Sequence, residues 1–163
     1  TQCRPEPFIT NPEKAKIMAD MGCKMVGIGV ECGNYDLRKT VLNRPMPDGI
    51  VEKAVKILND AGILVAAYYI IGFPGETKEM IQETIDLHRR INPFRSSVRF
   101  LHPYPGTPIR DYCVKMGFID EDFEDKYLPG TYFSEPVLKL PSPPSPTKEE
   151  LVQLRNEFFK KDI

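Results

Sequence analysis

The sequence has no cluster of basic residues, no long apolar run and no secretory signal, and each absence excludes a class of protein. Its 163 residues carry a net charge of −1, and no run of Lys and Arg marks a nucleic-acid-binding face. No apolar run reaches the roughly 18–20 residues that a membrane helix needs. The N-terminus has no charged segment followed by an apolar one. We therefore expect a globular domain with its own core that binds neither nucleic acid nor membrane.

Cysteine is scarce and widely spaced. The four cysteines are Cys3, Cys23, Cys32 and Cys113, and no two of them have CxxC spacing. This spacing excludes a zinc ribbon and a self-contained iron–sulfur motif. The cysteines are also too few for a disulfide framework at this size, so we predict reduced thiols and a cytoplasmic location. The chain begins with Thr1 rather than Met, which indicates a piece of a longer protein.

What the sequence does contain is an alternation of strand and helix patterns. Asn11 and Asp48 are expected to cap helices, and Gly22 and Gly62 to end them. The alternation predicts a parallel sheet with right-handed crossovers, in a barrel or a doubly wound fold. Three such units cannot close an eight-stranded barrel, so further strands are expected before Thr1. The expected strands are 24–30, 63–71 and 96–102, and the expected helices are 11–21, 36–42, 48–61, 77–88 and 107–116.

Three of these strands end in segments rich in glycine or proline. The segments are 27–34, 70–77 and 100–107, and the second contains the turn Gly72-Phe73-Pro74-Gly75. In α/β proteins the carboxyl ends of parallel strands are where ligands bind. The sequence therefore predicts one ligand-binding rim built from successive strand ends.

The pattern changes after Gly117. An acidic stretch, 120–125, precedes an irregular one with Tyr127, Tyr132 and Phe133. The proline-rich segment 141–146 predicts a stiff, extended linker. A capping box at 147–150 opens a last helix with Leu151, Leu154 and Phe158 on its apolar face. We divide the chain into a barrel part, 1–117, and a tail, 118–163.

Five short motifs follow one another in a fixed order. They are Gly-Val-Glu-Cys-Gly-Asn at 29–34, Val-Leu-Asn-Arg at 41–44, Gly-Ile at 62–63, Ile-Ile-Gly-Phe-Pro-Gly-Glu-Thr at 70–77 and Pro-Tyr-Pro-Gly-Thr-Pro at 103–108. Their order and spacing resemble the second half of a radical S-adenosylmethionine (SAM) domain, and the tail resembles the branch that carries an upstream cobalamin-binding domain.

The resemblance implies the fold, the cofactors and the partners. The fold is a partial parallel (β/α) barrel, the second half of a TIM-like (β/α)6 barrel, followed by a C-terminal helix. The full-length parent is expected to bind SAM and a 4Fe–4S cluster, to cleave SAM to a 5′-deoxyadenosyl radical, and to act on a small-molecule substrate. The branch implies cobalamin as a further cofactor, although these residues specify neither its use nor the substrate. The CxxxCxxC loop that holds the cluster is absent, so we expect this chain to lack the other barrel half and to be inactive alone.

The same resemblance implies the cofactor-binding residues. Glu31 is expected to bind the ribose or the methionine part of SAM, and Gly33 flanks it. Arg4 follows a truncated strand and is expected to meet the SAM carboxylate. The adenine is expected to lie against two strand ends. These consist of Ile71, Gly72 and Phe73 on one strand and Leu101, His102 and Pro103 on the next.

Each of these residues also has a structural interpretation. Glu31 also has an explanation as a surface acid at a strand end, and His102 as a strand-end histidine with a structural part. For Arg4, a frayed terminal residue is an equal alternative. The Gly-Pro-Gly turn also joins strand to helix, where Glu76 and Thr77 are expected to bind free backbone amides. Cys32 is expected to be a small buried filler.

Two other functions stay open from the sequence. One is a non-catalytic half-barrel that binds a ligand or the missing half. The other is an unrelated α/β barrel enzyme that binds a phosphorylated ligand, although the Gly-Pro-Gly turn lacks the Lys and clustered amides of a P-loop. A truncated barrel also leaves an unpaired edge strand, so we expect self-association through that edge.

Overall fold

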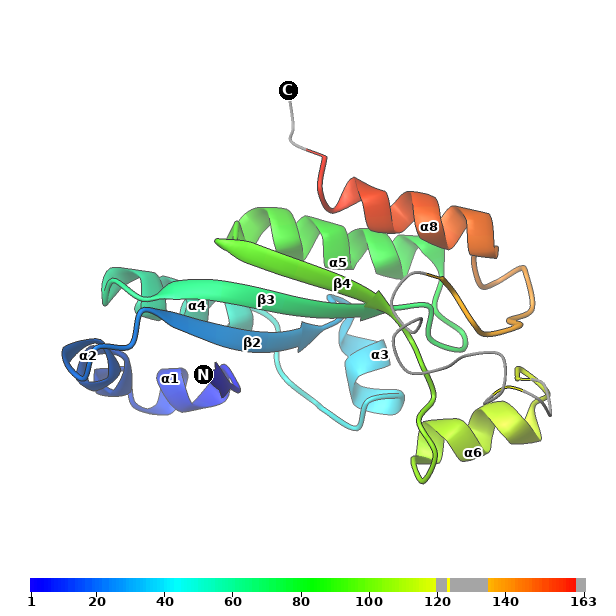
Figure 1. The fold of residues 1–163 in the computed structure, drawn as a ribbon, viewed down its shortest axis with the longest axis horizontal. Coiled ribbons are helices and arrows are strands. Elements are labelled where there is room, and N and C mark those ends of the chain that lie inside the picture. Colours follow the sequence, from blue (N-terminus) through cyan, green and yellow to red (C-terminus); the bar gives the residue numbers. More distant parts are fainter. Residues whose placement is uncertain (120–122, 124–134, 161–163) are drawn as a thin grey trace. The chain divides into compact units, whose positions relative to one another are not determined.

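Parallel strands alternate with helices along the chain, as Figure 1 shows. The computed structural model describes residues 1–119, 123 and 135–160. Within these residues, four strands form one sheet in the order β1-β2-β3-β4. The elements are β1 (Gln2–Cys3), α1 (Glu6–Thr10), α2 (Glu13–Asp20), β2 (Met25–Glu31), α3 (Tyr35–Thr40), α4 (Ile50–Asp60), β3 (Leu64–Ile71), α5 (Lys78–Ile91), β4 (Arg95–Phe100), α6 (Pro108–Lys115) and α8 (Lys148–Glu157).

The chain divides into two compact units. The first comprises Thr1–Tyr69 and Glu83–Ser97, and the second comprises Ile70–Gln82 and Val98–Ile163. The boundary passes along β3, α5 and β4, so each of these elements contributes residues to both units. The predicted division after residue 117 stays a prediction, and the acidic stretch and the tyrosines expected near 127 and 132 lie largely outside the described residues.

In the first unit, β2 pairs in parallel with both β1 and β3. The side chains of β2 alternate: Val26, Ile28 and Val30 are fully buried, while Glu31 is only half-buried. The register shifts between Gly29 and Glu31, where β2 has an irregularity of the bulge type. Such a bulge re-aims the side chain that follows it. The direction of the Glu31 side chain is therefore set by this irregularity in β2.

The helix starts differ from the expectations at two places. Neither Asn11 nor Asp48 caps a helix through its side chain, because α2 begins after Pro12 and α4 begins after Gly49. Asp48 is instead bound by Arg38, whose Nη2 donates to Asp48 Oδ1 at 2.6 Å. The predicted caps were therefore wrong. The sequence also gave no signal for the short helix α1, which begins among prolines.

In the second unit, the tail forms a turn and a helix. The proline-rich segment is not extended as expected, because residues 142–144 form a turn and Ser145 donates its amide to the Pro141 carbonyl at 3.2 Å. The predicted capping box is confirmed: Glu150 donates its amide to Thr147 Oγ1, and the Glu150 carboxylate accepts from the Thr147 amide. Glu150 also pairs with Lys78 at the start of α5. The start of α8 is thus tied to α5 within this unit.

None of the helices in the described part of the chain is long and apolar enough to cross a membrane.

Candidate functional site

A polar cavity of about 280 Å³ lies at the carboxyl end of β2 in the first unit. It is open to solvent and contains two predicted site residues, Arg4 and Glu31, together with Arg44. Gln2, Cys3 and Gly29 complete its lining. The structure therefore brings the two predicted residues from β2 and the end of β1 to one place, as the strand order requires.

Glu31 has an unusual backbone at this point. Its φ of +66° lies in the left-handed region, which non-glycine residues rarely adopt. Its side chain folds back over Gly29, where an added Cβ would lie 2.5 Å from Glu31 Oε1. A side chain at position 29 would therefore force the Glu31 carboxylate to move away from its present position. The bulge and the glycine together hold Glu31 over the face of the sheet.

Arg44 is a site residue that the sequence reasoning did not single out. Its Nη1 donates to the Gly29 carbonyl at 2.8 Å and lies 3.7 Å from Glu31 Oε1. Its Nε is buried and has no hydrogen-bond partner among the described residues. The available signal was its position at the end of the Val-Leu-Asn-Arg motif. The cavity is therefore lined by an arginine that lies beside both the Gly29 carbonyl and the Glu31 carboxylate.

Opposite effects act on the Glu31 carboxyl. Burial raises its pKa above the ordinary value, and the nearby Arg44 charge lowers the pKa in part. The side chain of Glu31 is 27% exposed and that of Arg44 is 15% exposed. A ligand that adds a positive charge at Glu31 would stabilise the ionised carboxylate.

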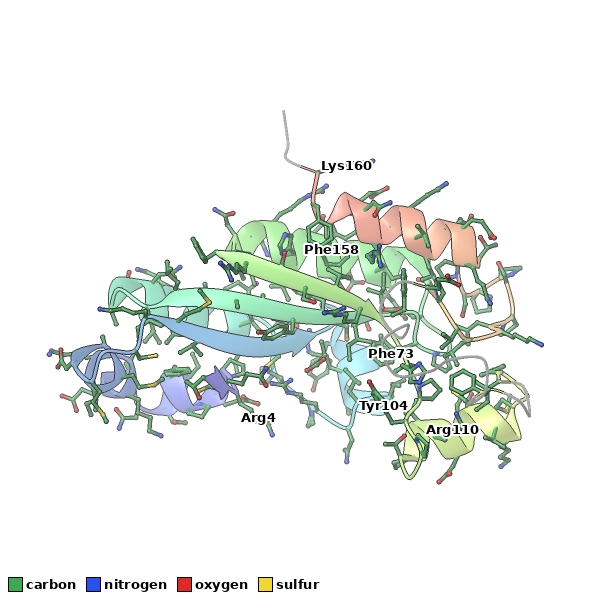
Figure 2. All side chains as sticks on the ribbon, viewed as in Figure 1. Arg4, Phe73, Tyr104, Arg110, Phe158 and Lys160 are labelled. Atoms are coloured by element: carbon green, nitrogen blue, oxygen red, sulfur yellow. The ribbon has the colours of Figure 1, made fainter. Side chains whose placement is uncertain are left out.

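Arg4 has a different local partner. Its Nη2 donates to Glu6 Oε1 at 2.6 Å, and its side chain is 66% exposed. Figure 2 labels this side chain beside the N-terminal elements. Arg4 lines the same cavity as Glu31, so an anionic ligand there would compete with Glu6 for the guanidinium.

Gly33 is held against α5 rather than facing that cavity. Its amide donates to Thr84 Oγ1 at 2.8 Å, and Thr84 is fully buried. A Cβ at Gly33 would lie 2.6 Å from the Glu83 carbonyl oxygen and 2.7 Å from Thr84 Cα. The glycine therefore has a packing reason to be there, and its cofactor role stays a prediction.

In the second unit, the turn after β3 is organised by a buried carboxyl. Glu76 Oε2 accepts from the amides of Gly72 and Phe73, at 2.6 and 3.1 Å. Glu76 was expected at the helix start, bound to free amides; the amides it binds are those of the turn. Burial raises its pKa to about 8, and the two amide bonds offset part of that rise. The turn with Ile71, Gly72 and Phe73 is thus fixed by a single side chain that is fully buried.

The next strand end joins this turn through the backbone. The Leu101 amide donates to the Ile71 carbonyl at 2.8 Å. The His102 ring packs on Tyr104 and Phe123, each at a centroid distance of 5.1 Å. Arg110 Nη1 donates to the Pro103 carbonyl at 3.4 Å, and Figure 2 places Arg110 close to Tyr104 at the start of α6.

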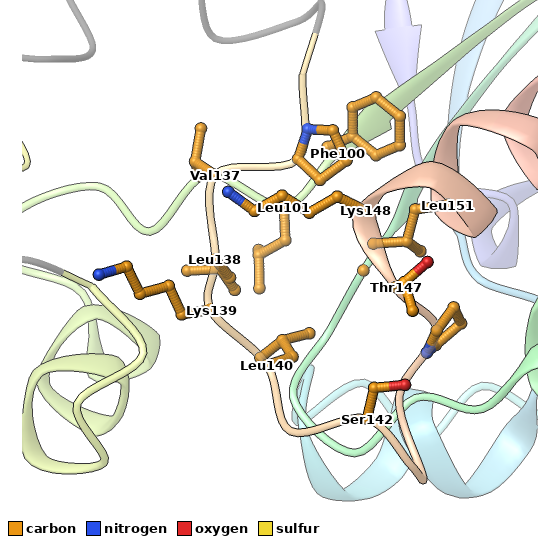
Figure 3. A pocket seen from close by; sticks show the side chains of 13 residues that line it. Phe100, Leu101, Val137, Leu138, Lys139, Leu140, Ser142, Thr147, Lys148 and Leu151 are labelled. Carbon is orange, nitrogen blue, oxygen red and sulfur yellow. The ribbon is translucent and has the colours of Figure 1, made fainter.

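An apolar pocket of about 220 Å³ lies in the same unit, and Figure 3 shows it from close by. Gly72 and Leu101 are the two predicted site residues that line it. The rest of its wall includes Phe100, the tail segment 136–140 and Leu151 of α8. Ile71, Phe73, His102 and Pro103 do not line this pocket.

The described residues contain no cluster of three or more His, Cys, Asp or Glu side chains that could hold a metal ion. None of the four cysteines, all of which lie in the described part of the chain, forms a disulfide. Residues that could hold an iron–sulfur cluster are therefore not found in the described part of the chain, whereas the charges of the first cavity fit a zwitterionic ligand.

Comparison with known proteins identifies relatives of this chain. The pattern of the radical SAM superfamily matches residues 2–88, more than half of the chain. An uncharacterized methyltransferase of Pyrococcus horikoshii is 29% identical over 130 residues, covering 80% of this chain and 27% of the relative. Bacteriochlorophyllide d C-12(1)-methyltransferase of Chlorobaculum tepidum is 29% identical over 154 residues, covering 94% of this chain and 32% of the relative. The chain thus spans about a third or less of these relatives.

A solved structure supports the same assignment at the level of the fold. The radical SAM methyltransferase TsrM from Kitasatospora setae, with cobalamin and a 4Fe–4S cluster bound, superposes with a TM-score of 0.63 at 23% identity. The match covers 71% of this chain and 21% of that protein. The expected partial parallel (β/α) barrel is confirmed. The chain belongs to the radical SAM superfamily.

Proposed function

We propose that this chain is the SAM-binding part of a radical SAM enzyme. The observation that carries the proposal is the Glu31 carboxylate beside the Arg44 guanidinium in one cavity at the end of β2. Strand ends of this kind are the usual ligand sites of parallel α/β folds.

The two charges match the amino-acid part of SAM. Its α-ammonium group can donate hydrogen bonds to the Glu31 carboxylate, and its α-carboxylate can accept them from the Arg44 guanidinium. Arg4 lies in the same cavity and offers a second guanidinium once Glu6 releases it. Charge-assisted bonds of this type are about twice as strong as neutral ones.

The strand ends of the second unit are proposed to bind the adenine. Ile71, Gly72 and Phe73 lie on a turn fixed by Glu76, and Leu101, His102 and Pro103 follow β4. Adenine needs a flat apolar surface with backbone polar groups at its edge. A turn whose amides are already bound by a buried carboxyl presents a fixed backbone for such recognition.

The cluster belongs to the part of the parent that this chain lacks. SAM bound to a reduced 4Fe–4S cluster supplies the 5′-deoxyadenosyl radical in this proposal. Among the described residues no group of His, Cys, Asp or Glu side chains could hold the cluster. The chain's own residues bind and orient SAM, and we propose that the chain alone is inactive without the other barrel half.

Methyl transfer is the reaction we favour for the parent. Two relatives bear the name methyltransferase, and so does the solved TsrM. We extend the proposal to a small-molecule substrate and to cobalamin, on a domain elsewhere in the parent. The four cysteines form no disulfide, which supports a reducing compartment, and we propose the cytoplasm.

A calorimetric titration of the 163-residue chain with SAM tests the proposal. We expect saturable binding that weakens about tenfold or more in Glu31→Gln, because a charge-assisted bond is lost. Glu13→Gln on α2, an exposed acid, is the control and leaves affinity unchanged. Absence of SAM binding with tight binding of inorganic phosphate would favour the phosphorylated-ligand barrel instead. A second assay measures 5′-deoxyadenosine formation by a longer protein, extended upstream and reconstituted with iron and sulfide. If this chain binds SAM but the longer protein forms no 5′-deoxyadenosine, the chain is a binding module and not part of a radical enzyme.

A further inference from the structure

A buried arginine joins the two stretches of chain that carry Glu31 and Arg44. Arg38 lies in α3, and its side chain is only 3% exposed. On one side of its guanidinium, Nη1 donates to the carbonyls of Cys32 and Gly33 at 3.1 and 2.6 Å. These two residues directly follow Glu31. The guanidinium therefore holds the chain just after the carboxylate of the proposed SAM site.

The other side of the same guanidinium holds the loop that carries Arg44. Its Nη2 donates to the Met46 carbonyl at 3.1 Å and to Asp48 Oδ1 at 2.6 Å. The Met46 amide in turn donates to the Arg44 carbonyl at 2.7 Å, and the Arg44 amide donates to the Arg38 carbonyl at 2.8 Å. Arg44 is thus held between the backbone and the side chain of Arg38.

The connection depends on the shape of the arginine side chain. Two acceptors lie on Nη1 and two on Nη2, and a planar guanidinium presents these donors in a fixed fork. A lysine at position 38 would keep the positive charge. It could not make all four bonds, because its three donors sit on one nitrogen.

Arg38 reaches the proposed site through these stretches and not by direct contact. Six of the described residues line the cavity of Glu31 and Arg44, and Arg38 is not one of them. It lines a separate cavity of about 350 Å³ together with Met46 and Asp48. A ligand between Glu31 and Arg44 would therefore be influenced by Arg38 only through the chain that Arg38 holds.

We propose that Arg38 is a positioning residue of the SAM site, which fixes the distance between Glu31 and Arg44 by holding the chain after each of them. This inference rests on the proposed function, because the same pair is proposed to bind the amino-acid part of SAM. A site whose charged groups are already held in place loses less conformational entropy when its ligand binds. Without the fork of Arg38, the loop of Arg44 is free to move away from β2.

The first test needs no ligand. The Arg44 charge lowers the pKa of the Glu31 carboxyl, so this pKa reports whether Arg44 stays beside it. We expect Arg38→Lys to raise the pKa in the same direction as Arg44→Gln, in an NMR titration of the carboxyl carbon. Arg90→Lys is the matched control, because Arg90 lines the same cavity as Arg38 but pairs with Glu52. It should leave the pKa unchanged.

The second test compares SAM with 5′-methylthioadenosine, which lacks the amino-acid part. We expect Arg38→Lys to weaken SAM binding by the 163-residue chain about fivefold and to leave 5′-methylthioadenosine within about twofold. A general loss of structure would weaken both ligands alike. The double variant Arg38→Lys with Arg44→Gln should bind SAM no more weakly than Arg44→Gln alone, because Arg38 acts through Arg44.

One further variant keeps the test decisive if Arg38→Lys does not fold. Asp48 is 79% exposed, and Asp48→Ala removes one of the four bonds. Loss of its negative charge alone would lower the pKa of Glu31. A rise in that pKa, smaller than in Arg44→Gln, is therefore expected from movement of Arg44.

The outcomes separate this inference from the function on which it rests. An unchanged Glu31 pKa in the folded Arg38 variant, equal losses of SAM and 5′-methylthioadenosine, or additive losses in the double variant would each overturn the inference while SAM binding stands. If Arg38→Lys does not fold, the absence of a rise in Asp48→Ala overturns it. Failure of the unaltered chain to bind SAM would instead remove the proposed function, and the Glu31 titration would still decide whether Arg38 positions Arg44.

Discussion

Arg44 and Glu31 lie with their charged atoms 3.7 Å apart, beyond hydrogen-bond distance, while Arg44 makes its hydrogen bond to the Gly29 carbonyl. The two side chains are therefore close enough to attract each other electrostatically, and no hydrogen bond between them has to break before a ligand binds. An ion pair joined by a hydrogen bond would have to break that bond before a ligand could bind between its members.

Replacing Arg44 should weaken SAM binding more than replacing Arg4. We expect Arg44→Gln to lower the affinity about tenfold, because a partly buried charged donor is lost. Arg4→Gln should have a smaller effect, since Arg4 is more exposed and already paired with Glu6. Calorimetric titration of both variants checks this. Equal losses would show that the exposed arginine is the carboxylate ligand.

Stability should fall as pH rises from about 4.5 to about 8, because of Glu76. Burial raises the pKa of its carboxyl to about 8 in the folded chain. The folded state therefore holds a proton that the unfolded chain releases above its ordinary pKa, and the stabilisation present below that pKa is lost toward pH 8. The effect is of the order of a few kcal/mol.

Denaturant unfolding across this pH range measures that dependence. Glu76→Gln keeps the shape and removes the titration, so its stability should vary less with pH. Glu149→Gln, an exposed acid in the first turn of α8, should keep the slope of the unaltered chain. The prediction is wrong if Glu76→Gln retains the full slope.

Gly33→Ala should destabilise the chain by about 1–3 kcal/mol, the usual cost of overpacking. The added methyl would meet backbone atoms of Glu83 and Thr84 in α5, which cannot move aside as a side chain can. Gly22→Ala is a useful comparison, because Gly22 has a φ of +90° but open space around it. Its cost should be about 1 kcal/mol, from backbone strain alone. Thermal unfolding of both variants decides between steric contact and strain.

Self-association through a sheet edge is also expected. β1 and β4 are the outer strands of the described sheet, and β1 has only two residues. Unpaired strand edges promote pairing with another chain. Sedimentation velocity should show dimers or larger species that increase with concentration. A single monomeric species at high concentration would contradict this.

The alternation of strands and helices was predictable because it follows from hydrophobic periodicity and from glycines at helix ends. Gly62 has a φ of +77°, as its predicted position at a helix end requires. The predicted caps at Asn11 and Asp48 were wrong for two different reasons. Next to Asn11, Pro12 takes the position before the first helical residue. Asp48 is bound by Arg38, a partner that periodicity does not reveal.

The candidate site was less predictable than the fold. Glu31 could be singled out because it ends a buried strand between glycines. Arg44 lies 13 positions later, and only the folded chain brings it to Gly29 and Glu31. Glu76 was expected near free amides, yet its complete burial depends on packing that a local motif does not contain.

The left-handed backbone of Glu31 places stability and activity in competition at one position. A non-glycine residue in this region costs roughly 1–3 kcal/mol, which a glycine would not. Selection for thermal resistance alone should therefore favour Glu31→Gly, and the resulting chain would fold better while losing the carboxylate. The carboxylate of Glu31 therefore costs this chain folding free energy that a glycine would not.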